Sequence, residues 1–250
     1  MLNLATMHYL IALFLCLVCS TSSMSETINV AVASNFRATA IQLKHMFEKE
    51  LPDSQINIIS GSSTKLFTHI QQGAPFHLFL SADTQLPQQL VSNKKTLQGP
   101  YRYAQGRLAL YSTKSGIDAQ QCLKQLCFDH IALANAKFAP YGMASDQTLS
   151  SLGLYERSQA KFIQSENIHQ VLQFIRTKNV DLGFVALSQL RALSIEENFW
   201  LIPQQLYQPI YQDAVLLLPA KNKPTAKRFW QFLKSQTAQH IMQQYGYLNP

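Results

Sequence analysis

The feature that most constrains the fold is a short apolar run that ends in small polar residues and passes at once into a helical pattern. Residues 28–35 read INVAVASN, and apolar side chains spaced three and four residues apart follow from Phe36. The arrangement returns at 55–65, where QINIIS precedes GSSTK. A strand that feeds a helix in this way presents unpaired backbone N–H groups at its carboxyl end, so each unit predicts a seat for an anion.

The same alternation continues along the chain. Apolar runs predict strands at 28–33, 55–60, 77–81, 107–112, 130–134, 181–186, 199–202 and 214–218. Amphipathic stretches predict helices at 36–50, 63–72, 85–93, 141–152, 168–177 and 225–245. Short apolar strands alternating with helices indicate an α/β fold with mostly parallel sheets covered on both faces. Ligands of such sheets bind beyond the carboxyl ends of the strands.

The first 25 residues are typical of a signal peptide. Residues 9–19 are continuously apolar, too short to span a bilayer, and small residues follow up to Ser25. The residues before the apolar run include His8 but no Lys or Arg. We expect export to the periplasm, with a buried or uncleaved apolar helix as the alternative. A lipid anchor at Cys19 is less consistent with the sequence, because Val18 stands where a small residue is expected.

The four cysteines divide between the signal sequence and the mature chain. Cys16 and Cys19 form a C-x-x-C inside the apolar run, and we interpret them as signal-peptide residues rather than a redox pair. Cys122 and Cys127 remain after cleavage. In an oxidising compartment they could form a local disulfide. Two buried thiols are the alternative, because the sequence does not fix the distance between their Cα atoms.

The charge balance is positive. The formal net charge is +7 and the sequence pI is about 9.2. The basic residues are scattered, and their densest cluster is Lys221, Lys223, Lys227 and Arg228. A diffuse positive field suits the steering of an anionic ligand, although it also fits an ordinary solvated surface.

Four strand-to-helix junctions offer backbone donors. They are Ser34-Asn35, residues 61–65 (GSSTK), residues 139–142 (APYG) and residues 165–167 (SEN). None needs a Lys or Arg, and fixed neutral dipoles at helix ends can hold a fully ionised tetrahedral oxyanion. Glu166 is the exception to this neutral set, and we expect it to cap its own helix. Taken singly, each junction is more consistent with an ordinary helix N-cap than with a ligand site, and the case for a site rests on several junctions together.

Several segments together resemble a known family. AVASN, GSSTKL followed by HIQQGAPFHLFLSAD, APYG, ENIHQVLQFI and DLGFVALSQL resemble the periplasmic molybdate-binding proteins of bacterial ABC importers over nearly the whole mature chain. The resemblance implies a type II periplasmic-binding-protein fold of two α/β lobes, each a mixed, mostly parallel sheet flanked by helices, with the ligand in the cleft between them. The expected lobes are 26–104 plus 206–250, and 105–205, joined by crossover strands near 105–112 and 207–218.

The resemblance also implies the ligand-binding residues, which would hold molybdate through hydrogen bonds. Ser34 corresponds to the first-junction residue that gives a hydroxyl and an N–H, and Asn35 to a position that donates a further backbone N–H. Ser63 corresponds to the second-junction serine. Tyr141 and Ile168 occupy positions that donate through their backbone N–H groups.

One position departs from the family pattern. Some members place a Tyr hydroxyl three residues after the Leu-Gly pair of the strand at 181–186, and here that residue is Ala186. Either this chain lacks that hydroxyl donor, or another residue replaces it, and Asn35 is a candidate for the replacement. We interpret Asp83, in the SAD motif, as a cap of the next helix rather than a ligand contact.

The implied function is capture of molybdate and tungstate in the periplasm and delivery to an inner-membrane ABC permease, by a monomer that needs no cofactor and binds no nucleic acid. The alternative is a carrier of sulfate, phosphate or a small organic anion. An enzyme is the main different class. The chain has no G-x-S-x-G, no H-E-x-x-H and no P-loop Gly-Lys pair, so its motifs favour binding over catalysis.

Overall fold

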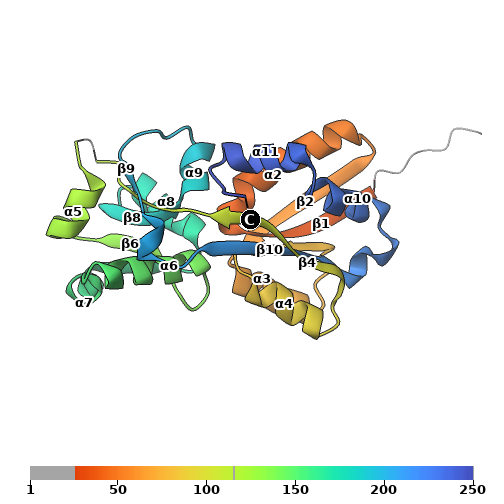
Figure 1. Cartoon of the computed structure of the whole chain (residues 1–250), viewed down its shortest axis with the longest axis horizontal. Coiled ribbons are helices and arrows are strands. Elements are labelled where there is room, and N and C mark those ends of the chain that lie inside the picture. Colours follow the sequence, from red (N-terminus) through yellow and green to blue (C-terminus); the bar gives the residue numbers. More distant parts are fainter. Residues whose placement is uncertain (1–25, 115, 250) are drawn as a thin grey trace, which may run out of the picture.

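The computed structural model describes residues 26–114 and 116–249. The predicted signal peptide, with Cys16 and Cys19, lies outside these residues. Two five-stranded sheets, each flanked by helices, lie side by side along the long axis of the molecule (Figure 1). We call the sheet that contains β1, with its helices, the first lobe, and the other sheet with its helices the second lobe.

The first lobe has the strand order β2-β1-β3-β10-β4. Its strands are β1 (Glu26–Ala33), β2 (Ser54–Gly61), β3 (Leu78–Leu80), β4 (Thr96–Gly106) and β10 (Ile210–Leu217). β1 is parallel to β2 and β3, whereas β10 is antiparallel to both β3 and β4. Ala33 pairs with Gly61, so β1 and β2 end at the same level and their carboxyl ends face the second lobe.

Helices cover both faces of this sheet, as the alternation of side chains along β1 requires. They are the 3₁₀ turn η1 (Ser34–Phe36), α2 (Arg37–Glu50), α3 (Ser63–Gln71), α4 (Gln85–Ser92), η4 (Leu218–Asn222), α10 (Pro224–Phe232) and α11 (Gln236–Gln244). Val30 and Val32 pack in the cluster that includes Leu43 of α2, whereas Ala31 packs with Leu66 of α3 on the opposite face.

The second lobe repeats the layout with the order β7-β6-β8-β5-β9. Its strands are β5 (Leu108–Tyr111), β6 (Ile131–Ala134), β7 (Phe162–Ser165), β8 (Leu182–Ala186) and β9 (Phe199–Leu201). Its helices are α5 (Ala119–Gln125), α6 (Pro140–Ser151), α7 (Tyr155–Ser158), η2 (Gln159–Lys161), α8 (Ile168–Arg176), α9 (Leu187–Ala192) and η3 (Gln204–Leu206). Here too three neighbouring strands are parallel and β5 runs against them. The predicted fold class, two mixed and mostly parallel sheets flanked by helices, is confirmed.

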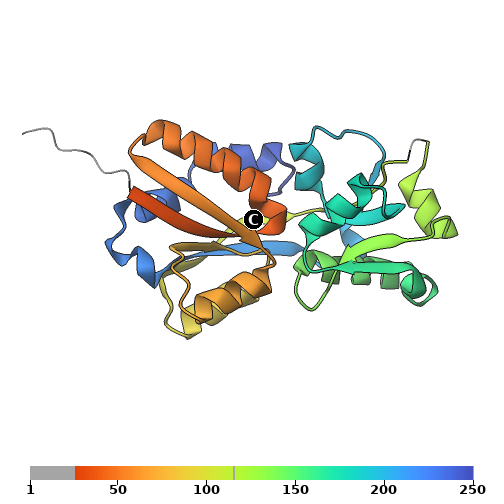
Figure 2. The same cartoon turned by 180° about the vertical axis from the view of Figure 1, so that it is seen from behind.

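The chain passes between the lobes twice. It leaves the first lobe at the end of β4 and enters the second at Leu108, and it returns between η3 and β10 (Figure 2). Gly106 of β4 pairs with Ile210 of β10, so the two connections lie together at the junction. The expected limits of the lobes, 26–104 plus 206–250 and 105–205, stay a prediction.

Several predicted elements are wrong or missing. β4 and β7 were not expected as strands, and α5, α7 and α9 were not expected as helices. The single helix predicted at 225–245 is two helices, α10 and α11. The break occurs because Ser235 begins a new helix there: its side chain accepts a hydrogen bond from the N–H of Ala238.

Cys122 and Cys127 form a disulfide at the end of α5, with their Cα atoms 5.0 Å apart. Of the two alternatives left open by the sequence, the local disulfide is therefore the one found. Within 26–114 and 116–249, no helix combines the length and apolarity that a membrane crossing requires.

Candidate functional site

A small pocket lies where the carboxyl ends of strands from both lobes meet. Its cavity volume is only about 10 Å³. That is below the usual range for drug-sized ligands, so the pocket suits an ion of a few atoms. The residues that line it are all neutral, and they are Ala33, Ser34, Asn35, Gly61, Ser62, Ser63, Ala82, Ala139, Pro140, Tyr141 and Ile168. All five residues expected from the sequence to bind the ligand are among them.

The starts of three helices at this pocket lack side-chain caps. Ala33 precedes η1, Ser62 precedes α3 and Ala139 precedes α6, and none of them accepts a hydrogen bond from its helix through a side chain. The first N–H groups of a helix have no partner inside it. The alternative of ordinary N-caps therefore does not apply at these junctions, and their N–H groups remain to bind an anion.

Tyr141 and Ile168 are placed by their neighbours to donate through the backbone. Pro140 begins α6 and has no N–H, so Tyr141 offers the first backbone donor of that helix. At α8, the side chain of Asn167 accepts from the N–H groups of His169 and Gln170. This cap leaves the N–H of Ile168, the first residue of the helix, at the pocket.

Ser63 is oriented as a hydroxyl donor. Its Oγ accepts the backbone N–H of Ala82 at 3.0 Å, and both residues are buried. A hydroxyl carries one hydrogen and two lone pairs. Since Ala82 occupies a lone pair and no acceptor within the described residues takes the hydrogen, this hydrogen is available to a ligand. Ser34 lies across the pocket and is only 8% exposed.

The side chain of Asn35 is directed elsewhere. Its Nδ2 donates to Gln212 Oε1 and to the Tyr247 hydroxyl, each at 3.1 Å. This amide is bound within the protein, so Asn35 could replace the missing tyrosine donor only through its backbone N–H, and that replacement stays a prediction. Ala186 itself is fully buried, its N–H is bound to Gln189 Oε1, and it does not line the pocket.

Two contacts between the lobes close the rim of the pocket. The Thr64 hydroxyl donates to the carbonyl of Phe138 at 3.3 Å, and Lys65 Nζ lies 2.9 Å from a carboxylate oxygen of Glu166. The expectation that Glu166 caps α8 is wrong, because Asn167 takes that role. Glu166 instead pairs with a lysine of the opposite lobe, whose positive charge offsets that of the carboxylate.

Asp83 lies near the pocket but binds the protein. Its Oδ1 accepts the N–H of Leu86 at 2.7 Å at the start of α4, as expected for a cap, and its Oδ2 accepts from the Ser81 hydroxyl. Burial raises the pKa of the Asp83 carboxyl. Asp83 borders a wider groove of about 590 Å³ between the lobes, which shares Ala82, Ala139 and Pro140 with the pocket.

The electrostatics of the pocket suit an anion and not a cation. Within the described residues, no group of three or more His, Cys, Asp and Glu side chains could hold a metal ion. The ring of His169, beside Ile168, adds no full charge near neutral pH, because burial and the nearby Arg37 guanidinium lower its pKa. Attraction of an anion thus falls to backbone dipoles and hydroxyl groups.

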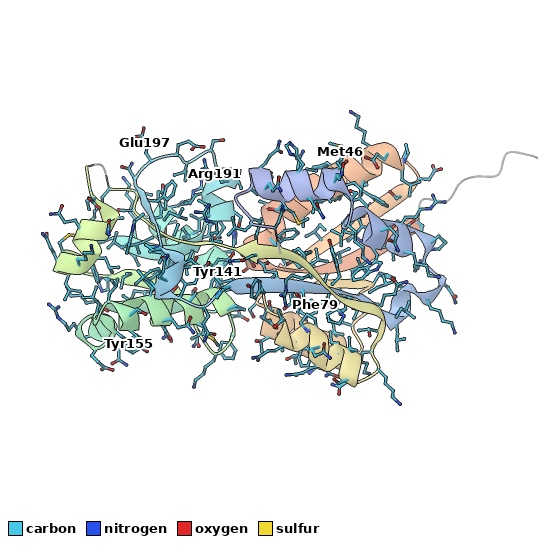
Figure 3. All side chains as sticks on the ribbon, in the orientation of Figure 1. Met46, Phe79, Tyr141, Tyr155, Arg191 and Glu197 are labelled. Atoms are coloured by element: carbon cyan, nitrogen blue, oxygen red, sulfur yellow. A yellow bond between two sulfur atoms is a disulfide. The ribbon has the colours of Figure 1, made fainter. Side chains whose placement is uncertain are left out.

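Sequence reasoning missed several residues around the site. Ser62 and Ala82 line the pocket, and their motifs, GSS and SAD, had signalled their place. Ser188, Gln212 and Tyr247 contact Asn35, and no local pattern signals them. Figure 3 shows Tyr141 at the junction of the lobes, well away from Phe79 in the core of the first lobe.

Comparison with known proteins gives consistent results. The family model described as bacterial extracellular solute-binding protein matches residues 28–248. The molybdate-binding protein ModA of Azotobacter vinelandii is 38% identical over 231 residues, which covers 90% of this chain and 91% of that protein. ModA of Rhodobacter capsulatus is 36% identical, with coverage of 87% and 86%. The solved structure of the Azotobacter vinelandii periplasmic molybdate-binding protein superposes with a TM-score of 0.84 at 33% identity, covering 89% of this chain and 99% of that one.

Proposed function

Because this chain belongs to the bacterial extracellular solute-binding protein family, we propose that it captures molybdate in the periplasm and delivers it to an ABC permease. Tungstate, which has nearly the same size and charge, is the expected second ligand. Its relatives are substrate-binding transport proteins rather than enzymes. The identity to two molybdate-binding relatives over almost the whole chain supports the choice of ligand.

The observation that carries the proposal is the neutral pocket at helix starts contributed by both lobes. A fully ionised tetrahedral oxyanion accepts hydrogen bonds and donates none, so it matches a lining that consists of N–H and O–H donors. A lining carboxylate would repel such an anion, and the pocket has none. We propose that Ser34 and Ser63 donate through hydroxyls, and that Asn35, Tyr141 and Ile168 donate through backbone N–H groups.

The two lobes give this binding its mechanism. Donors from η1 and α3 belong to the first lobe, and donors from α6 and α8 belong to the second. An anion that contacts both sets holds the lobes together, and closure excludes water so that each dipole acts in a lower dielectric. The closed form is the one that the permease would recognise. Selection against sulfate would follow from pocket size, because both anions are tetrahedral dianions.

Isothermal titration of the chain from Glu26 onward tests the proposal. The protein is titrated with molybdate, tungstate, sulfate and phosphate, and we expect molybdate and tungstate to bind tightly and sulfate not to bind. The Ser34→Leu variant is the control, since a bulky side chain in the pocket should abolish the heat. If sulfate or phosphate binds and molybdate does not, the proposed ligand is wrong. If none of the four anions gives heat, the proposed oxyanion-binding function is wrong.

A further inference from the structure

A buried group of polar side chains lies directly behind the pocket, at the junction of the lobes. We call it the Asn35 network. Its members are all less than 5% exposed, and they are Asn35, Tyr103, Tyr141, Ser188, Gln212 and Tyr247. They come from η1, β4, α6, α9, β10 and the segment after α11, so segments from the whole length of the chain meet here.

Asn35 is held by hydrogen bonds to its backbone carbonyl and from its side-chain amide. Its backbone carbonyl accepts from Ser188 Oγ at 2.9 Å and from the Tyr247 hydroxyl at 3.0 Å, and these two hydroxyl oxygens are 3.0 Å apart. Its amide donates to Gln212 and Tyr247. Because Asn35 lines the pocket, these contacts, made by its carbonyl and its side chain, hold this residue in place at the pocket wall.

The network spans both lobes. Ser188 is the second residue of α9 and Tyr141 the second residue of α6, both in the second lobe, whereas Asn35, Gln212 and Tyr247 belong to the first. Separating the lobes breaks the contacts of Ser188 with Asn35 and Tyr247. Buried polar groups need partners, so these hydrogen bonds are complete only when the lobes are closed.

The C-terminal segment is fixed at this point. Gln105 and Leu248 exchange two backbone hydrogen bonds of 3.0 Å, which places Tyr247 against the connection between β4 and β5. The space beside it is full, since a Cβ at Gly106 would lie 2.1 Å from the Tyr141 hydroxyl and 2.7 Å from Gln212 Nε2. Burial raises the pKa of the Tyr247 hydroxyl, which therefore stays protonated and able to donate.

We propose that Ser188 and Tyr247 are positioning residues for the bound oxyanion. They do not touch the ligand but hold Asn35, and Ser188 does so only in the closed state, so both slow the release of the anion. The proposal rests on the proposed function of the pocket. It also accounts for Ala186. Some members of the family bring a tyrosine hydroxyl to the ligand from this position, whereas in this chain the hydroxyl of Ser188, two residues later, holds Asn35.

The experiment compares Ser188→Ala and Tyr247→Phe with two matched controls, Ser158→Ala and Tyr207→Phe. Ser158 and Tyr207 are also buried hydroxyl residues, but they bind backbone atoms of Leu154 and Leu108 and do not contact Asn35. Association and dissociation rates for molybdate are measured by stopped flow, and melting temperatures are measured with and without ligand.

We expect Ser188→Ala and Tyr247→Phe each to raise the dissociation rate about fivefold, with association rates within about twofold of wild type. The double variant should release faster than either, by less than the product of the two factors, because the residues share one network. For Ser188→Ala, the melting temperature of the ligand-free protein should change less than that of the liganded protein, since separation of the lobes leaves the Ser188 hydroxyl to water.

Unchanged release from both variants would overturn the proposal. So would an equal effect in the control variants, or, for Ser188→Ala, an equal drop in melting temperature with and without ligand, which would indicate a purely structural role. If wild-type protein does not bind molybdate, the proposed ligand is wrong, and the same rates measured with whichever of tungstate, sulfate or phosphate binds then decide the role of Ser188 and Tyr247. If none of the four anions binds, the proposed function and this inference both fail.

Discussion

Replacing Ser63 with alanine should produce two separable losses. Ser63 Oγ accepts the N–H of Ala82 at 3.0 Å, and its hydrogen remains for the ligand. A hydrogen bond to a charged group contributes about 1.5–3 kcal/mol, so the dissociation constant for molybdate should rise about 10- to 100-fold. The buried N–H of Ala82 also loses its acceptor, which should lower the free energy of unfolding of the ligand-free protein by about 1–3 kcal/mol.

Titration calorimetry gives the first quantity and urea denaturation without ligand gives the second. Ser158→Ala is the matched control. Ser158 is fully buried and its Oγ donates to the carbonyl of Leu154, a group that keeps the backbone N–H of Ser158 as a partner. That variant should bind as wild type does. If Ser63→Ala loses stability but keeps full affinity, the hydroxyl is not a ligand donor, and if its stability is unchanged, the inferred role of its lone pair is wrong.

Three further predictions concern features outside the pocket. Lys65 and Glu166 are about half exposed, so their contact across the lobes contributes at most about 1 kcal/mol. Glu166→Gln should therefore weaken molybdate binding about two- to fivefold at low salt and not at high salt. A charge-swapped pair that fails to restore affinity would contradict this role. Replacing Cys122 and Cys127 with serine should lower the free energy of unfolding by about 2 kcal/mol with no change in anion affinity, and a change in affinity would show that the disulfide influences the pocket. Burial lowers the pKa of His77, so this ring takes up a proton more readily in the unfolded chain than in the folded one. The free energy of unfolding should therefore fall as pH drops from 7 through 6.5 toward the folded-state pKa. The His77→Gln variant should lose less of this free energy between pH 7 and 5 than wild type does.

The pocket could be predicted from the sequence because each of its strand-to-helix junctions is formed by contiguous residues. A strand, one or two small polar residues and a helix are contiguous, and the carboxyl ends of parallel strands meet at one edge of a sheet. The pattern therefore indicated the four junctions without any knowledge of which strands pair, and the family resemblance implied Ser34, Ser63, Tyr141 and Ile168 within them. The structure brings them into one pocket, and their contact with a ligand stays a proposal.

The Asn35 network behind the pocket could not be predicted in this way. Ser188, Gln212 and Tyr247 lie between 59 and 212 residues from their partners, and each reads locally as an ordinary helix, strand or loop residue. Only the three-dimensional course of the chain brings them to Asn35. For the same reason the sequence does not indicate that the Asn35 amide is bound within the protein.

Two errors in the secondary structure have physical causes. β4 contains the polar stretch TLQGPYRYAQG, which lacks the apolar run of a buried strand, and it forms because β10 provides a long partner along its edge. The helix predicted at 225–245 has a continuous amphipathic pattern, and periodicity alone does not detect a break in which Ser235 caps a second helix. Capping and strand pairing depend on partners that a periodic pattern does not contain.

The place of β10 in the first sheet also determines the order in which the molecule can be completed. All five strands of the second sheet come from residues 108–201, whereas the first sheet needs residues 210–217 between β3 and β4. A chain that emerges with its N-terminus first can therefore finish the second lobe while the first still has two unpaired strand edges. A product truncated before Ile210 would keep every strand of the second sheet but lose the strand that joins β3 to β4 in the first, the lobe that carries three of the five proposed donors.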